Sequence, residues 1–333
     1  MRPQLALTFA LLVTLAGGLR DAAAQDGEPE HVIRIATLAP RGTVAERALR
    51  TWNRELGERT GERLSVRVYW GGAMGDERSM IRRMRIGDLD AASLTTLGLS
   101  QLVRETLVLQ VPGVLTTYDE VARAHTELDA DFHTSFRAAG FELLGWGDSG
   151  RIRFFSTSAL ARPSDLRTRR PWLREDDAIF GAYLEEVGAT GHVVGVGEVL
   201  AGLSTGMIDT VPGTALVVAG LQWASALTHM TATSRGFLVG GMVIRNEFLE
   251  SLSEEERTAI LETAAESQGR ITNALREVDD QMYDALLAHG MIADDISGHA
   301  SEWLATETAV RTRISGRVVP TALVDRVVAA VRP

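Results

Sequence analysis

The sequence contains no cysteine and no lysine, and each absence excludes a kind of chemistry. Without cysteine the chain has neither disulfides nor a thiol nucleophile. All 34 basic residues are arginine, so no amine is present for a Schiff base or for the lysine of a phosphate-binding loop. The formal net charge of −10 argues against nucleic acid as a partner, because proteins that bind it present a basic face.

Long apolar runs are also scarce, and the one near the N-terminus is short. Residues 5–18 are apolar and follow Arg2, and residues 22–24 are the small residues of a cleavage site. This pattern predicts a signal peptide over residues 1–24. A membrane-spanning helix would need about 20 apolar residues, which is more than this run provides. Because there is also no cysteine to carry a lipid anchor, we expect an exported protein that diffuses freely in the periplasm.

Recognisable catalytic and metal-binding patterns are missing as well. None of the seven histidines has a second ligand at zinc spacing, and no Gly-x-Ser-x-Gly or calcium loop occurs. Gly195 and Gly197 lack the third glycine and the acidic partner of a dinucleotide site. Paired acids, at residues 176–177 and 185–186, are interpreted as solvated helix faces. The sequence therefore predicts no cofactor, no metal site and no enzyme.

What the chain does contain is an alternation of strand and helix patterns. Residues 31–37 and 64–70 alternate in polarity as strands do, whereas residues 43–56 and a segment starting at Asp76 have apolar residues at helical spacing. Two successive strand–helix–strand units imply parallel strands joined by right-handed crossovers. The fold class is therefore α/β, and the length suits two domains.

Two later segments bear on how such domains would be joined. Residues 141–146 read as a strand, and residues 148–150 after it are interpreted as a hinge. Ser253 and Glu256 form a capping box that opens a helical pattern reaching His289. A single helix of this length would span about 50 Å. Two helices with a break near Gly269 are the alternative.

Four motifs follow one another along the chain. They are VYWGGAMGDE at residues 68–77, GDLD at 87–90, QVPG at 110–113, and a longer region over residues 150–213. Each motif is weak alone, but the ordered set covers most of the chain after residue 30. In this order they resemble the DctP-type substrate-binding receptors of TRAP transporters.

The resemblance implies a two-domain architecture like that of periplasmic binding proteins, with a long helix bridging both domains and a ligand cleft between them. We expect domain I to comprise residues 31–149 and about 238–278, and domain II residues 150–237 and about 279–333. Hinge closure would bury one small molecule. The implied partners are the TRAP membrane subunits, and some such receptors also use a tetratricopeptide-repeat periplasmic partner.

The resemblance also points to a departure in the ligand site. In the family, a segment that begins Asp-Leu presents an arginine that clamps the ligand's carboxylate, and counting from Asp165 places Trp172 there. An indole offers an apolar face and one N–H, whereas a guanidinium binds a carboxylate through two hydrogen bonds. After Asp209 the family's Glu-Asn pair is also missing. We therefore expect a ligand that is more hydrophobic and less charged than the family's usual organic acids.

The residues expected to line the cleft follow from where loops leave strands. Arg153 corresponds to a family arginine at the ligand's polar end, with pairing to Asp148 across the hinge as the alternative. Trp223 and Met242 are further sources of apolar surface. The predicted ligand-binding residues are Leu38, Trp70, Trp146, Arg153, Trp172, Pro212, Gly213, Thr214 and Phe237.

Three other functions stay open at this point. The first is a receptor for organic acids whose clamp has shifted to Arg170 or Arg174. The second is a ligand sensor for a signalling partner. The third is an unrecognised enzyme that acts in the cleft, although no nucleophile–base pair is evident in the sequence.

Overall fold

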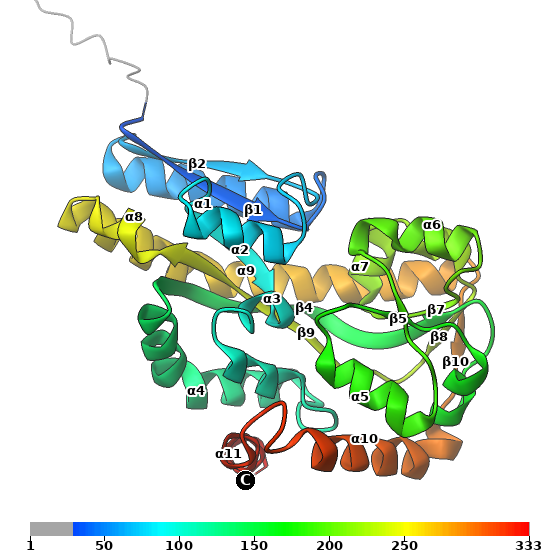
Figure 1. The fold of residues 1–333 in the computed structure, drawn as a ribbon. Coiled ribbons are helices and arrows are strands. Elements are labelled where there is room, and N and C mark those ends of the chain that lie inside the picture. The colour runs from blue at the N-terminus through cyan, green and yellow to red at the C-terminus, as the bar shows by residue number, and fades with distance from the viewer. Residues whose placement is uncertain (1–28, 333) are drawn as a thin grey trace, which may run out of the picture.

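A computed structural model describes residues 29–332 of the chain, so the predicted signal peptide lies outside the described residues. Within that range, no helix combines the length and apolar character needed to cross a bilayer. An eight-stranded mixed sheet runs through both halves of the molecule in the order β10-β8-β4-β9-β3-β1-β2, with β7 also paired to β4 (Figure 1). Helices cover this sheet and define two lobes, so the predicted α/β class with two domains is confirmed.

The first lobe begins with the two predicted strand–helix–strand units. Strand β1 (His31–Thr37) pairs in parallel with β2 (Leu64–Tyr69) and with β3 (Ala91–Thr95). Helices α1 (Val44–Thr60) and α2 (Glu77–Arg85) connect them. The three apolar residues that give α2 its helical spacing are all buried, as expected from the pattern: Met80, Ile81 and Met84.

Two long antiparallel strands join the lobes. Strand β4 (Phe141–Ser156) pairs with β9 (Gly236–Arg245), and the first-lobe end of β9 also pairs with β3. The predicted hinge at residues 148–150 is therefore not a break between strands but part of one 16-residue strand. The pairing register shifts between Asp148 and Arg151, which marks an irregularity at the position of the expected hinge.

The second lobe is built on the far half of β4. Strand β7 (Thr210–Gly213) and strand β8 (His229–Thr231) both pair with β4, and β10 (Ile292–Asp294) pairs with β8. A separate parallel pair consists of β5 (Trp172–Leu173) and β6 (His192–Val193). The helices of this lobe are α5 (Ala178–Val187), α6 (Val199–Ser204), α7 (Ala215–Gly220) and α10 (Ala300–Ile314).

The C-terminal helix returns to the first lobe. Helix α11 (Thr321–Val331) packs against α4 (Tyr118–Ala138), where Arg326 forms ion pairs with Glu127 and Asp131. The expected division placed residues after about 279 in the second domain, whereas α11 contacts α4 of the first lobe. The remaining first-lobe elements are α3 (Thr96–Leu99), the 3₁₀ turn η1 (Arg104–Gln110) and α8 (Asn246–Glu250).

Helix α9 (Glu254–Ala288) is continuous over 35 residues and runs along both lobes (Figure 1). Its N-terminus has the predicted capping box, in which Ser253 and Glu256 satisfy each other's backbone N–H groups. In its second half, the Asp279 carboxylate accepts hydrogen bonds from the backbone N–H of Arg151 and of Leu216, both at 3.0 Å. One side chain thus joins α9 to β4 and α7. The predicted bridging helix is confirmed, and the alternative of a break near Gly269 is wrong.

The continuity of α9 leads to a prediction at Gly269. This glycine is exposed in the middle of the helix, and an added methyl group would meet no atom within 4 Å. Alanine loses less backbone entropy than glycine on forming a helix, so Gly269→Ala should raise the free energy of unfolding by about 0.5–1 kcal/mol. Urea denaturation of both proteins measures this change. A lower stability in the variant would contradict an uninterrupted helix.

Candidate ligand cavity between the lobes

A cavity of about 410 Å³ lies between the lobes and is lined mainly by apolar side chains. The loop after β1 contributes Leu38 and Pro40 on the first-lobe side, and β5 and β7 contribute Trp172 and Pro212 on the other. Residues of β4 and β9, the strands that connect the lobes, also line it. Clefts at the ends of strands between two α/β units commonly hold small ligands, which makes this cavity the candidate binding site.

Five of the nine predicted ligand-binding residues line this cavity, and so do Trp223 and Met242. They come from four separate regions of the chain: the loop after β1, strand β5, strand β7 and strand β9. The five residues are Leu38, Trp172, Pro212, Gly213 and Phe237. A position at or beside a strand end is therefore a useful signal for this site, because ligand clefts of α/β folds lie where strands end.

Three other predicted residues lie outside the cavity. Trp70 is partly buried and packs against the first-lobe core. Trp146 is buried, and its ring stacks on that of His125 in α4 with 5.3 Å between the ring centroids. Thr214 is the N-cap of α7, where its side chain accepts a hydrogen bond from the backbone N–H of Val217. These three residues have structural roles, so the structure corrects their assignment to the cleft.

Arg153 is the fourth residue outside the cavity. Its neighbours Ile152 and Phe154 line the cavity, whereas the guanidinium of Arg153 lies over the ring of Tyr283 in α9, 4.2 Å from the centroid. Burial lowers the pKa of Arg153, and the nearby Asp279 carboxylate opposes that shift. The alternative pairing with Asp148 is also absent, since Asp148 instead binds Arg276 with both carboxylate oxygens 3.0 Å from Nε.

Trp172 occupies the cavity wall with its polar atom already bonded. The residue is 7% exposed, and its indole N–H donates to the carbonyl oxygen of Val194 at 2.9 Å. Its ring meets Trp223 edge to face, with 5.3 Å between centroids. The indole N–H is therefore not free for a ligand, and Trp172 contributes apolar surface alone.

The two arginines considered as a shifted clamp differ in position. Arg170 pairs with Asp209, with 3.2 Å between Nε and Oδ2, and its side chain does not line the cavity. Arg174 does line it, and its Nη2 donates to Glu77 at 2.7 Å and to Asp176 at 3.2 Å. Burial by itself would lower the pKa of Arg174, but the carboxylates of Glu77 and Asp176 outweigh it and raise that pKa.

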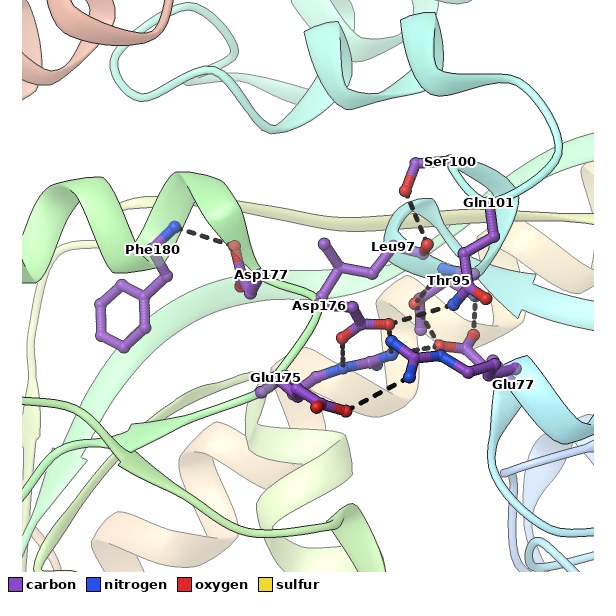
Figure 2. A network of polar contacts seen from close by, with 12 residues as sticks. Glu77, Thr95, Leu97, Ser100, Gln101, Glu175, Asp176, Asp177 and Phe180 are labelled. Carbon is purple, nitrogen blue, oxygen red and sulfur yellow. Dashed lines mark hydrogen bonds and ion pairs between the residues drawn. The ribbon is translucent and has the colours of Figure 1, made fainter. Parts of the chain in front are cut away.

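The polar residues beside Arg174 were not predicted from the sequence. Glu77 appeared only as part of a family motif, and residues 176–177 were interpreted as a solvated helix face. In the structure Asp176 binds Arg174 and also accepts from Gln101 at 3.1 Å (Figure 2). Asp177 lines the cavity and caps α5 by accepting from the backbone N–H of Phe180, and burial raises the pKa of Asp177. That interpretation is therefore wrong.

A second guanidinium, that of Arg235, also lines the cavity. Arg235 pairs with Glu307 of α10, with 3.4 Å between Nη1 and Oε1. Burial raises the pKa of the Glu307 carboxyl, and Arg235 opposes the shift. The hydroxyl of Tyr183 is buried beside this pair and has no hydrogen-bond partner in the described structure. Both cavity-lining arginines thus already have carboxylate partners within the chain.

Comparison with known proteins gives consistent matches. The profile of the bacterial extracellular solute-binding proteins, family 7 (DctP), matches residues 35–307. A solute-binding protein from Verminephrobacter eiseniae is 25% identical over 255 residues, which cover 74% of each chain.

Two crystal structures of TRAP periplasmic solute-binding proteins have the same fold. One, from Shewanella oneidensis with bound succinate, has a TM-score of 0.84 at 18% identity. The other, from Roseobacter denitrificans with bound β-D-glucuronate, has a TM-score of 0.83 at 19% identity. In both cases the match covers 90% of this chain and 99% of the other.

The family profile extends from β1 into α10, so it includes both lobes and the cavity between them. The order of motifs, the bridging helix and the interlobe cavity agree with it. The chain therefore belongs to the DctP family of bacterial extracellular solute-binding proteins, and it is a TRAP-type periplasmic solute receptor rather than an enzyme.

Proposed function

We propose that this receptor binds one small molecule that is uncharged or mainly hydrophobic, and delivers it to the membrane subunits of a TRAP transporter. The proposal rests on the ion pairs that the two cavity-lining arginines already form. Arg174 is bound by Glu77 and Asp176, and Arg235 is bound by Glu307. A ligand carboxylate would have to compete with these internal carboxylates for either guanidinium.

The aromatic wall supports the same ligand class. Trp172 and Trp223 form an edge-to-face pair on the second-lobe side, and Phe237 adds a third ring from β9. Aromatic side chains of this size bury about 150–250 Å² each and favour apolar contact. Because the indole N–H of Trp172 is already bonded to Val194, this wall offers hydrophobic contact in place of a charged clamp.

The proposed transport cycle uses the connections between the lobes. Export by cleavage after residue 24 would release the protein into the periplasm. We propose that the first lobe, with α11 added to it, and the second lobe move as two bodies about β4, β9 and α9. Bending near the register shift between Asp148 and Arg151 would open the cavity. Nothing in the described residues supports a tetratricopeptide-repeat partner, so we leave it outside the proposal.

A carboxylate receptor with Arg174 as its clamp is the competing function. One observation favours it: Arg174 is a guanidinium that lines the cavity, two residues beyond the position counted for the family clamp. The relatives with bound succinate and bound β-D-glucuronate show that this fold accommodates organic acids. In this function, ligand binding would replace the pairing of Arg174 with the chain's own carboxylates.

Native mass spectrometry of the purified protein tests the proposed ligand class. We expect a retained ligand without a carboxylate, and addition of that ligand at about 100 times its dissociation constant should raise stability by about 2.7 kcal/mol. Incubation should leave the ligand chemically unchanged. Recovery of an organic acid, together with loss of its binding in Arg174→Met, would contradict the proposal and support the competing function.

A further inference from the structure

Glu77 is a buried carboxylate placed between the lobes. It is the first residue of α2, and only 1% of it is exposed. One carboxylate oxygen accepts from the backbone N–H of Thr95, and the other accepts from the Thr95 hydroxyl at 2.9 Å and from Arg174 Nη2 at 2.7 Å (Figure 2). Thr95 belongs to the first lobe and Arg174 to the second, so this side chain joins the two lobes.

The first lobe holds the Glu77 carboxylate in a fitted slot. Asp76 caps α2 by accepting from the backbone N–H of Ser79, which fixes the start of the helix. A methyl group added to Gly98 would lie 2.8 Å from Cδ of Glu77. Only a residue without a side chain therefore fits at position 98 while the carboxylate keeps this place. The slot orients Glu77 toward Arg174 before any ligand enters.

The Arg174 guanidinium is already paired with two carboxylates of the chain. Besides Glu77, the guanidinium has Asp176 at 3.1 Å from Nε, and the nearby Asp177 carboxyl also lines the cavity. A ligand carboxylate that took the Nη2 edge of Arg174 would have to displace Glu77 and leave that group buried without a counter-ion. Breaking a buried ion pair on one side is strongly unfavourable, because it leaves an uncompensated charge in a region of low dielectric.

We propose that Glu77 is a specificity-determining residue, an internal counter-ion that occupies Arg174 and thereby excludes anionic ligands from the cavity. The inference rests on the proposed function, since it explains why a receptor of this fold accepts uncharged ligands. The chain's own carboxylate bridges the lobes at Arg174, where a ligand carboxylate would otherwise do so. A further interlobe contact supports this bridge: Gln101 donates to Asp176 at 3.1 Å.

Glu77→Gln tests this inference because it removes the charge with little change in shape. Isothermal titration calorimetry with succinate and with D-glucuronate should show an affinity about tenfold to a hundredfold higher than for the unaltered protein, the range equivalent to one charge-assisted hydrogen bond. Glu175→Gln is the matched control. It makes the same change in net charge at the same interface, where the Glu175 side chain is 75% exposed and its carboxylate pairs with Arg78, whereas Arg174 pairs with Glu77 and Asp176. We expect it to change neither affinity.

The gain should depend on the released guanidinium. In the double variant that carries both Glu77→Gln and Arg174→Met, the affinity for carboxylates should return to that of the unaltered protein. A folded Glu77→Gln protein that binds carboxylates no better than Glu175→Gln would overturn the inference. If Glu77→Gln does not fold, carboxylate binding is measured on the unaltered protein instead. Tight binding that disappears in Arg174→Met would overturn the inference about Glu77, and absence of such binding would support it.

These outcomes are distinct from failure of the proposed function. If mass spectrometry finds an uncharged ligand and Glu77→Gln gains no carboxylate affinity, the ligand class stands and only the role of Glu77 fails. If it finds an organic acid bound through Arg174 in the unaltered protein, both fail. Affinity of Glu77→Gln for the retained uncharged ligand, measured in the same titrations, separates a change in specificity from a general loss of the site.

Discussion

Trp172→Arg should bind simple carboxylates about tenfold to a hundredfold more tightly than the unaltered protein. An arginine here would place a guanidinium against Trp223 in the cavity wall, at the position counted for the family clamp. The carboxylates of Glu77 and Asp176 are already paired with Arg174. A ligand carboxylate would then supply the missing counter-ion, and a charge-assisted pair of hydrogen bonds accounts for an effect of this size. Calorimetry with succinate measures it.

A control at the neighbouring ring separates position from charge. Trp223→Arg puts the same guanidinium into the same aromatic pair, but not at the clamp position, so we expect little gain in carboxylate affinity. Trp172→Phe keeps an aromatic ring in the wall but loses part of its area and the hydrogen bond to Val194, and it should not bind carboxylates either. Equal gains in both arginine variants would mean that any added positive charge suffices, and the positional argument for Trp172 would then be lost.

Local sequence patterns predict much of this fold because the relevant interactions are short-range. The alternating residues of β1 were bounded correctly from residue 31 to residue 37, and the capping box at Ser253 and Glu256 located the start of α9. Both features depend on residues within one strand or one helical turn. The cavity residues that were predicted, such as Leu38 and Pro212, follow from strand ends, which a sequence also reveals.

The predictions that failed depend on long-range geometry. Arg153 was placed in the cleft from its position in a motif, but the face of a strand on which a residue lies depends on register, and β4 has two register shifts before that residue. The pairing of Glu77 with Arg174 joins residues 97 apart in the chain. A glutamate in the first turn of a helix is ordinarily interpreted as a solvated partner of the helix dipole, so nothing local marks Glu77 as buried.

Acidification from about pH 7.5 to about pH 4.5 should destabilise the protein through His125, by about 2.5 kcal/mol. Burial, with a smaller contribution from Arg276, lowers the pKa of His125 from 6.5 to about 4. The ring is stacked on Trp146, and its Nε2 is buried without a partner in the described structure. In this window the unfolded chain binds a proton that the folded chain does not. The stability is therefore complete above the unfolded pKa and is lost as the pH falls.

His125→Phe keeps an aromatic ring against Trp146 and removes the titrating group. Over the same pH range its free energy of unfolding should therefore fall by about 2.5 kcal/mol less than that of the unaltered protein. Contributions from buried carboxyls with raised pKa values, such as that of Glu307, are common to both proteins and cancel in the difference.

His133 provides a control of opposite sign. A hydrogen bond to Glu142 raises the pKa of His133, so its stabilisation is present below the unfolded pKa and is lost as the pH rises. In His133→Phe, the loss of stability on acidification should therefore be larger than in the unaltered protein. Equal losses in the unaltered protein and in His125→Phe, measured by urea denaturation, would show that His125 already carries its proton in the folded state.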